Sequence, residues 1–99
     1  MPDLKLSISR TAQSDLRGIW QYTAKTWSID QADTYLRDLQ SKFDMLCETP
    51  LIATEYSKFS PPIRVLRSGR HLILCNIKED KLRILRIMHT SQDWMNILS

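Results

Sequence analysis

The sequence has very few of the residues on which several kinds of active site depend. Of its 99 residues, two are glycine, two are cysteine and two are histidine. Two isolated glycines cannot form the glycine-rich loop that surrounds a nucleotide phosphate. The cysteines and histidines lie too far apart in the chain for the spacing of a zinc site, and no Gly-x-Ser-x-Gly motif of a serine hydrolase occurs. We therefore expect no metal, no cofactor and no catalytic residue of these kinds.

Long apolar runs are also missing. No stretch approaches the roughly 20 apolar residues that span a bilayer, and Asp3 and Lys5 interrupt any apolar start that could serve as a signal peptide. Cys47 and Cys75 each lie among apolar residues, where a free thiol is a small hydrophobic group and not half of a disulfide. These features predict a cytoplasmic protein with no membrane segment.

The length and the net charge of the chain limit the classes of protein that remain possible. A chain of 99 residues forms one domain, 1–99, with a modest core. The net charge is +3 and is unevenly placed: residues 1–50 carry six Lys/Arg and seven Asp/Glu, whereas residues 51–99 carry eight and four. A basic second half fits an acidic partner, either nucleic acid or protein, although such charge is usually only solvated surface.

The first half of the sequence has the pattern of a strand followed by two helices. Apolar residues alternate with polar ones over residues 4–8, and then recur at steps of three and four over 12–27 and again over 28–47. Ser28 and Gln31 have the spacing of a helix capping box, and Pro50 ends the second helix. Because only a residue or two separates the helices, we expect an antiparallel helical hairpin.

The second half has the pattern of a strand-rich segment. After an irregular stretch over residues 50–62, strands are predicted at 63–66, 71–77 and 82–89, with turns at Ser68-Gly69 and at 78–81. A short last helix is predicted over 91–98, with Ser91 as its cap. The order is βααβββ(α), and the fold class is α+β, with the hairpin packed on one face of a mainly antiparallel sheet.

Residues 82–89 predict a strand that is apolar on both faces. Strict alternation places Arg86 between Ile84 and Met88 on one face, and Leu85 between Arg83 and Ile87 on the other. Because the hairpin covers only one face, we expect the other to be uncovered and to bind a partner. The alternatives are that the terminal segment folds over part of it, or that the chain dimerises through it. Arg86 should pair with an acidic group of this chain or of a partner.

A cluster of cations accompanies the two histidines. Arginines around a phosphate, together with a base of near-neutral pKa such as His71 or His89, could serve a metal-free ribonuclease. The simpler interpretation is that Lys78, Lys81 and Arg83, in and beside the turn at 78–81, are surface charge and that His89 is a structural histidine. The cluster consists of Arg64, Arg67, Arg70, Lys78, Lys81, Arg83 and Arg86.

Taken together, these segments resemble the ParE toxins of the RelE/ParE superfamily, the toxic halves of bacterial type II toxin–antitoxin pairs. The resemblance is carried by the helix pair from Asp15 to Pro50, by "SGRHLIL" and by "LRILRIMH" followed by Asp93. It implies a RelE/ParE-like, microbial-ribonuclease-like fold and an antitoxin bound along the apolar surface in a hetero-oligomer. For the free chain, a homodimer is an alternative to a monomer. The residues that we expect to bind the antitoxin or the target are Arg64, Arg67, Arg70, His71, Arg86, His89 and Trp94.

The superfamily has two activities. RelE-like members cleave mRNA on the ribosome, usually with a tyrosine or histidine near the C-terminus, whereas ParE-like members poison DNA gyrase without nuclease chemistry. This chain has no tyrosine after Tyr56, and Thr90 and Ser91 are not bases at neutral pH. The residues therefore favour gyrase inhibition over the nuclease. Residues 53–56 and 60–63 lack the glycines usual in ParE-like chains, so a drifted, inactive toxin is an alternative, as is a small basic nucleic-acid-binding module.

Overall fold

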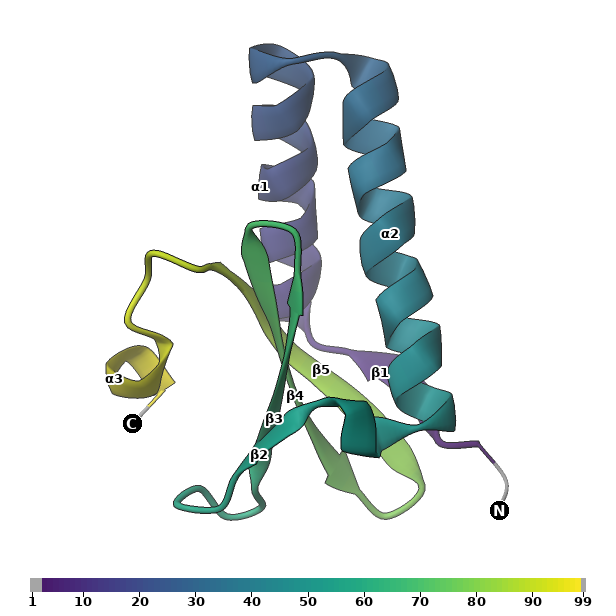
Figure 1. Ribbon diagram of the computed structural model, residues 1–99, viewed down its shortest axis with the longest axis vertical. Coiled ribbons are helices and arrows are strands. Elements are labelled where there is room, and N and C mark those ends of the chain that lie inside the picture. Colours follow the sequence, from purple (N-terminus) through teal and green to yellow (C-terminus); the bar gives the residue numbers. More distant parts are fainter. Residues whose placement is uncertain (1–2, 99) are drawn as a thin grey trace.

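Two long helices lie side by side and cover one face of a five-stranded sheet (Figure 1). The strand order is β1-β5-β4-β3-β2, with β1 parallel to β5 and the other neighbours antiparallel, so the predicted α+β fold is confirmed. The computed structural model describes residues 3–98. Its elements are β1 (Lys5–Ile8), α1 (Arg10–Thr26), α2 (Ile29–Glu48), the 3₁₀ helix η1 (Pro50–Ile52), β2 (Thr54–Tyr56), β3 (Ile63–Ser68), β4 (His71–Lys78), β5 (Lys81–His89) and α3 (Trp94–Leu98).

Side-chain caps set the start of both long helices. Ser9 Oγ accepts the Ala12 amide at 3.0 Å, and Ser28 Oγ accepts the Gln31 amide at 3.0 Å. Each bond satisfies one of the backbone donors that a helix start leaves free. The predicted cap at Ser28 is confirmed. Pro50 begins η1 one residue after Thr49 caps the end of α2, a position that suits proline because its missing amide donor is not needed there.

The main core lies between the helical hairpin and the sheet. Leu39, Phe43 and Leu46 of α2 are almost completely buried against Ile73 of β4 and Leu82 of β5. Burial of side chains of this size stabilises the fold by about 1.5–3 kcal/mol each. This core fixes the position of α2 above the sheet, and hence the position of every side chain that α2 extends towards α1.

An irregularity in β5 makes the predicted alternation wrong. Leu74 pairs with Arg86 and Cys75 pairs with Ile84, so Leu85 has no partner across the ladder. One extra residue reverses the alternation that follows it. Ile87 therefore faces the helices, as Ile84 does, whereas Met88 faces the opposite side of the sheet.

The sheet face opposite the hairpin is covered, so the expectation of a free apolar face is wrong. Leu74, Met88 and Val65 pack there against Trp94 of α3, which is only 8% exposed. The segment before β3 adds Tyr56 and Phe59, whose rings lie 4.9 and 5.9 Å from the Trp94 ring. The alternative that the terminal segment folds over part of this surface is confirmed.

Two smaller differences lie in the second half of the chain. The stretch expected to be irregular contains η1 and the edge strand β2. The last helix begins at Trp94, because the Ser91 hydroxyl contacts His89 Nδ1 at 2.7 Å and does not cap the helix. Cys47 and Cys75 are buried free thiols. Within residues 3–98, no helix has the length and apolar character needed to cross a membrane.

Candidate functional site

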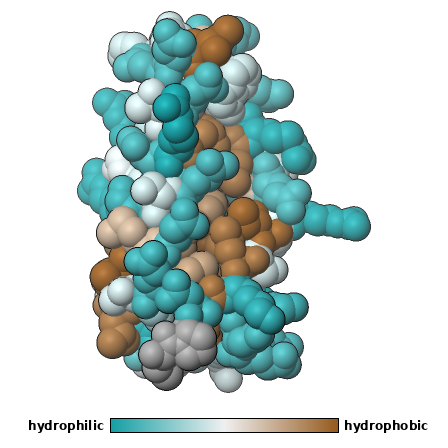
Figure 2. Space-filling view, turned by 90° about the vertical axis from the view of Figure 1, so that its right-hand side faces the viewer, coloured by the Kyte–Doolittle hydropathy of each residue, from teal (hydrophilic) through white to brown (hydrophobic). Residues whose placement is uncertain are grey.

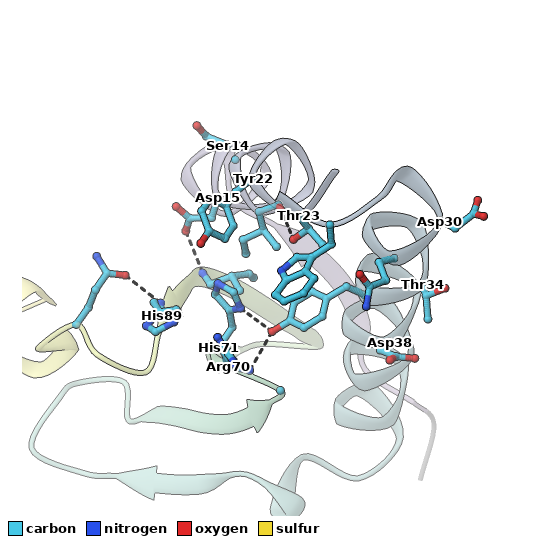
Figure 3. Close-up of a pocket in the computed structure, with 18 residues that line it drawn as sticks. Ser14, Asp15, Tyr22, Thr23, Asp30, Thr34, Asp38, Arg70, His71 and His89 are labelled. Carbon is cyan, nitrogen blue, oxygen red and sulfur yellow. Dashed lines mark hydrogen bonds between the residues drawn. The ribbon is translucent and has the colours of Figure 1, made fainter. Parts of the chain in front are cut away.

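A groove of about 900 Å³ lies between the two helices of the hairpin and the adjoining ends of β4 and β5 (Figure 3). We call it the hairpin groove. Its floor is the end of the sheet where β4 begins at His71 and β5 ends at His89, and its two walls are helices. The lining residues are Ser14, Asp15, Gly18, Ile19, Tyr22, Thr23 and Trp27, then Asp30, Gln31, Thr34, Tyr35 and Asp38, then Gly69, Arg70, His71, Ile87, His89 and Gln92.

Helical spacing explains the composition of the two walls. On α1, Asp15, Gly18 and Tyr22 are three and four residues apart and so share one face. On α2, Thr34 and Asp38 recur at the same spacing on the side turned towards α1. Each wall therefore presents one stripe of its helix, on which Tyr22 is largely exposed whereas Asp15 is mostly buried. Figure 3 shows Asp30 extending outwards from the rim of α2.

The Tyr35 hydroxyl holds the turn between β3 and β4 against α2. It lies 2.6 Å from His71 Nδ1 and 3.2 Å from the Ser68 carbonyl oxygen, and it accepts the Arg70 amide at 3.0 Å. Gly69 between them has φ +59°, and a Cβ there would lie 2.8 Å from the hydroxyl oxygen. Only glycine fits this turn without strain. The contact thereby fixes the backbone that carries Arg70 and His71.

The two histidines of the chain lie side by side on the floor. Their ring centroids are 5.4 Å apart, with the planes at 87°, and His89 Nδ1 is 2.7 Å from Ser91 Oγ. Burial lowers the pKa of His71, and the positive charge that His89 can carry lowers it further, whereas Asp15 acts in the opposite direction. His71 is therefore a neutral imidazole near pH 7.

Arg86 pairs with an acidic group of its own chain, one of the two outcomes expected from the sequence. Asp15 Oδ2 accepts Arg86 Nε at 2.9 Å, and Asp15 Oδ1 accepts Nη2 at 3.2 Å. This hydrogen bond to Asp15 is the main reason that the pKa of Arg86 is raised, with burial opposing it. Asp15 Oδ2 also accepts the Ile87 amide at 2.9 Å. The carboxylate and guanidinium thus satisfy each other, and Asp15 forms part of the groove wall whereas Arg86 does not.

The seven residues predicted to form a binding site do not converge on one place. Arg70, His71 and His89 line the hairpin groove. Arg64 pairs with Glu55 on β2, and Arg67 Nε donates to the Gly69 carbonyl at 2.9 Å. Arg86 is bound to Asp15 and Trp94 lies in the core of the opposite face, so neither lines the groove. Within residues 3–98, no three His, Cys, Asp or Glu side chains are placed to hold a metal ion.

Comparison with known proteins identifies the family. The family described as "ParE toxin of type II toxin-antitoxin system, parDE" matches residues 6–94. The chain belongs to the ParE toxin family. Its relatives include Toxin ParE1 of Mycobacterium tuberculosis, which is 32% identical over 87 residues, covering 87% of this chain and 89% of that protein. Toxin ParE1 of Caulobacter vibrioides is 30% identical over 86 residues, covering 87% of this chain and 88% of the other.

More distant ParE proteins match this chain over a similar length and have the same fold. Toxin ParE of Escherichia coli is 26% identical over 93 residues, covering 93% of this chain and 90% of that protein. The structure titled "Chromosomal ParDE TA system from P. aeruginosa" superposes with a TM-score of 0.74 at 19% identity, covering 87% of this chain and 95% of that one. The predicted resemblance to ParE toxins is confirmed, and the ParE fold extends over nearly the whole chain.

Proposed function

We propose that this ParE toxin acts by binding and inhibiting DNA gyrase, without cleaving RNA, and that an antitoxin neutralises it by occupying the hairpin groove. Gyrase inhibition is the activity that the resemblance to ParE-like chains implies. Gyrase and the type II antitoxins are intracellular, so the toxin acts in the cytoplasm in this proposal. The free toxin is then the active form, and the toxin–antitoxin hetero-oligomer is the inactive one.

The pairing of Arg86 with Asp15 is the observation that most supports a non-enzymatic toxin. A metal-free ribonuclease needs a guanidinium free to meet a phosphate. Here both carboxylate oxygens of Asp15 hold Arg86, Arg64 is paired with Glu55, and Arg83 Nε donates to Asn76 Oδ1 at 2.8 Å. The arginines of the sheet therefore each donate at least one hydrogen bond to a group of their own chain.

The hairpin groove is the surface that best suits an antitoxin segment. The opposite face of the sheet is covered by α3, whereas the groove is open and has Ile19, Tyr35 and Ile87 in its lining. Gly18 lies in the middle of α1, where glycine destabilises a helix by up to about 1 kcal/mol relative to alanine. A Cβ at Gly18 would meet nothing within 4 Å, so the glycine leaves additional space in the groove.

One specific observation favours the second candidate function, an RelE-like mRNA nuclease. His71 and His89 lie together beside Tyr35 and the Arg70 amide, and two histidines with a tyrosine are the types of side chain that transfer protons. The Arg70 side chain is exposed at the same rim. One observation argues against the nuclease: the Nδ1 atoms of both histidines already have hydrogen-bond partners within the chain.

Expression of the toxin in a bacterium without its antitoxin distinguishes the candidates. Gyrase inhibition should give filamentous cells, broken DNA and an SOS response while existing mRNA stays intact. Rapid translation arrest with mRNA cut on the ribosome, lost in His71→Gln or His89→Gln, would support the nuclease. Absence of toxicity from a folded, well-expressed chain would indicate a drifted toxin.

A pair of matched tryptophan variants tests whether the antitoxin occupies the groove. Gly18→Trp places a large ring in the groove, whereas Gln21→Trp places the same ring on an exposed position of α1 that does not line it. We expect Gly18→Trp to weaken antitoxin binding at least tenfold, about 1.4 kcal/mol, and Gln21→Trp to leave it unchanged. Circular dichroism should show the same fold for both. Equal affinity of the two folded variants would place the antitoxin on another surface.

A further inference from the structure

Two imidazole nitrogens on the floor of the hairpin groove have no hydrogen-bond partner within residues 3–98. His71 and His89 each use Nδ1, towards Tyr35 and Ser91 respectively, and neither Nε2 atom makes a hydrogen bond in this part of the chain. Every buried side-chain nitrogen or oxygen among the same residues has a partner, so both Nε2 atoms are open to solvent. A partner that covers the floor loses affinity unless it supplies hydrogen bonds to them.

The backbone at Ser91 fixes which nitrogen of His89 carries the hydrogen. The Ser91 amide donates to His89 Nδ1 at 3.1 Å, and the Ser91 hydroxyl lies 2.7 Å from the same atom. An amide can donate only to a nitrogen that has a free lone pair, so Nδ1 is unprotonated and the neutral ring carries its hydrogen on Nε2. His89 Nε2–H is therefore a hydrogen-bond donor.

The Tyr35 hydroxyl gives His71 the same arrangement. Its oxygen accepts the Arg70 amide at 3.0 Å, and its one hydrogen can go to His71 Nδ1 at 2.6 Å or to the Ser68 carbonyl oxygen at 3.2 Å. The shorter contact takes the hydrogen, which leaves the hydrogen of the neutral His71 ring on Nε2. The floor thus offers two N–H donors, on rings whose centroids are 5.4 Å apart.

Arg70 adds a positive charge at the same end of the groove. Its side chain is exposed, and its guanidinium has no ion pair or hydrogen bond within the described residues. The Arg70 carbonyl oxygen accepts the Thr90 amide at 3.0 Å, which keeps this residue beside the end of β5 at His89. A free guanidinium and two N–H donors are groups that bind an anion.

The carboxylates that line the groove do not neutralise this end of it. Asp15 is held by Arg86, with 2.9 Å between Oδ2 and Nε. Figure 3 shows Asp30 and Asp38 on α2, pointing away from the two histidines. The donors on the floor therefore have no anion of the described chain, and an anionic group of a partner can reach them.

We propose that one carboxylate side chain of the antitoxin, an aspartate or a glutamate, binds at the floor of the hairpin groove, where it accepts hydrogen bonds from the Nε2 atoms of His71 and His89 and pairs with Arg70. The inference rests on the proposed occupation of the groove by the antitoxin, and it adds the chemistry of the partner at this point. A carboxylate has two acceptor oxygens and no donor, so it can meet both rings and the guanidinium. A hydroxyl or a backbone carbonyl has one oxygen and no charge.

A double-mutant cycle between the full-length toxin and its cognate antitoxin tests the contact. Each aspartate and glutamate of the antitoxin is changed in turn to the corresponding amide, and affinity is measured for the wild-type toxin, His71→Phe and His89→Phe. We expect one antitoxin position where loss of the charge weakens binding to the wild-type toxin about tenfold or more, and binding to either phenylalanine variant less than about threefold. Circular dichroism confirms that each variant is folded.

A glutamine at position 89 separates the lost donor from the lost ring. The amide nitrogen of glutamine is as many bonds from Cα as Nε2 of histidine, so His89→Gln keeps an N–H donor near the same place. We expect His89→Gln to retain most of the coupling to the antitoxin carboxylate that His89→Phe loses. Equal loss in the two variants would overturn the hydrogen bond from His89, because the ring alone would then carry the effect.

The positive charge of Arg70 has a matched control at the far end of the same strands. Lys81 pairs with Lys78, whereas His71 pairs with His89 at the opposite end of the β4–β5 ladder. Arg70→Gln and Lys81→Gln each remove one positive charge. We expect Arg70→Gln to weaken antitoxin binding about threefold to tenfold and Lys81→Gln less than about twofold. Equal effects would overturn the pairing with Arg70, because net charge alone would explain them.

The tryptophan variants separate failure of this inference from failure of the proposed function. If Gly18→Trp weakens antitoxin binding and no antitoxin carboxylate is coupled to the histidines, the groove is the binding site but the proposed contact is wrong. If Gly18→Trp and Gln21→Trp bind equally well, the antitoxin lies on another surface, and both the groove and the carboxylate contact are rejected. Coupling at one carboxylate, together with weaker binding of Gly18→Trp, is the result that the proposal predicts.

Discussion

Asp15 on α1 and Arg86 on β5 join the helical hairpin to the sheet through two hydrogen bonds, although 71 residues separate them in the chain. The carboxylate is 15% exposed and the guanidinium 26%. The same carboxylate accepts the Ile87 amide. These three bonds fix the height of α1 above the end of β5, and so they set the width of the groove between α1 and the histidine pair.

Removal of one member of this pair should destabilise the fold. Asp15→Ala leaves Arg86 and the Ile87 amide without their partner, and we expect the free energy of unfolding to fall by about 2 kcal/mol. Lys5→Ala is the matched control, because its ion pair with Asp80 is exposed on both sides and should be worth less than about 1 kcal/mol. Urea denaturation measures both. An Asp15→Ala midpoint equal to that of Lys5→Ala would show that the bonds contribute little.

The two glycines should respond to alanine in opposite directions. Gly69 has φ +59° and would bring a Cβ to 2.8 Å from the Tyr35 hydroxyl, whereas a Cβ at Gly18 meets nothing within 4 Å. We expect Gly69→Ala to lose about 1–2 kcal/mol of stability and Gly18→Ala to gain up to about 1 kcal/mol. Thermal denaturation of both variants, monitored by circular dichroism, measures the difference. A Gly69→Ala protein as stable as the wild type would mean that the turn is not held against Tyr35.

The two thiols should be unreactive in the folded toxin. Burial raises the pKa of Cys75 to about 12, and burial together with nearby acidic groups raises the pKa of Cys47. Because the thiolate is the reactive form, a disulfide reagent such as Ellman's should react slowly with the native protein and rapidly with both cysteines after denaturation. Rapid modification of either thiol under native conditions would show that the core at α2 and β4 opens readily.

Folding stability should decline in mild acid because of His71. Its pKa is lowered in the folded state, so the unfolded chain binds a proton first as the pH falls. The stability contributed by the neutral imidazole is present above about pH 6.5 and is lost as the pH falls through the lower folded value. His71→Gln should remove this part of the pH dependence. Urea midpoints that vary equally with pH in the wild type and the variant, between about pH 7 and pH 5, would contradict the assignment.

The features predictable from the sequence are those that depend on near neighbours in the chain. Helical periodicity and the cap at Ser28 depend on residues a few positions apart, and the structure has both. The unpaired Leu85 in β5 and the parallel pairing of β1 with β5 depend on contacts between distant segments. Strict alternation cannot reveal them, and it therefore places Met88 and Ile87 on the wrong faces.

In the candidate site too, the sequence predicts what depends on single residues or near neighbours and not what depends on contacts between distant segments. Arg70, His71 and His89 were found because their residue types stand out in a strand-rich segment. Asp15 and Tyr35 were missed because each looks like an ordinary residue of an amphipathic helix. Asp15 has helical spacing with Gly18, and Tyr35 has it with Asp38, but only the packed hairpin shows that these two helix faces are turned towards each other. The apolar side chains visible on the α2 side of the molecule (Figure 2) likewise form a surface only after folding.

The activity of purified gyrase tests the central claim most directly. Folded toxin freed from its antitoxin is added to gyrase with relaxed plasmid and ATP, and supercoiling and DNA cleavage are measured, with mRNA on translating ribosomes as the parallel substrate. We predict that supercoiling falls as toxin is added, that equimolar antitoxin restores it, and that the mRNA remains intact. Full gyrase activity in the presence of folded toxin, together with cleaved mRNA, would contradict the proposed function.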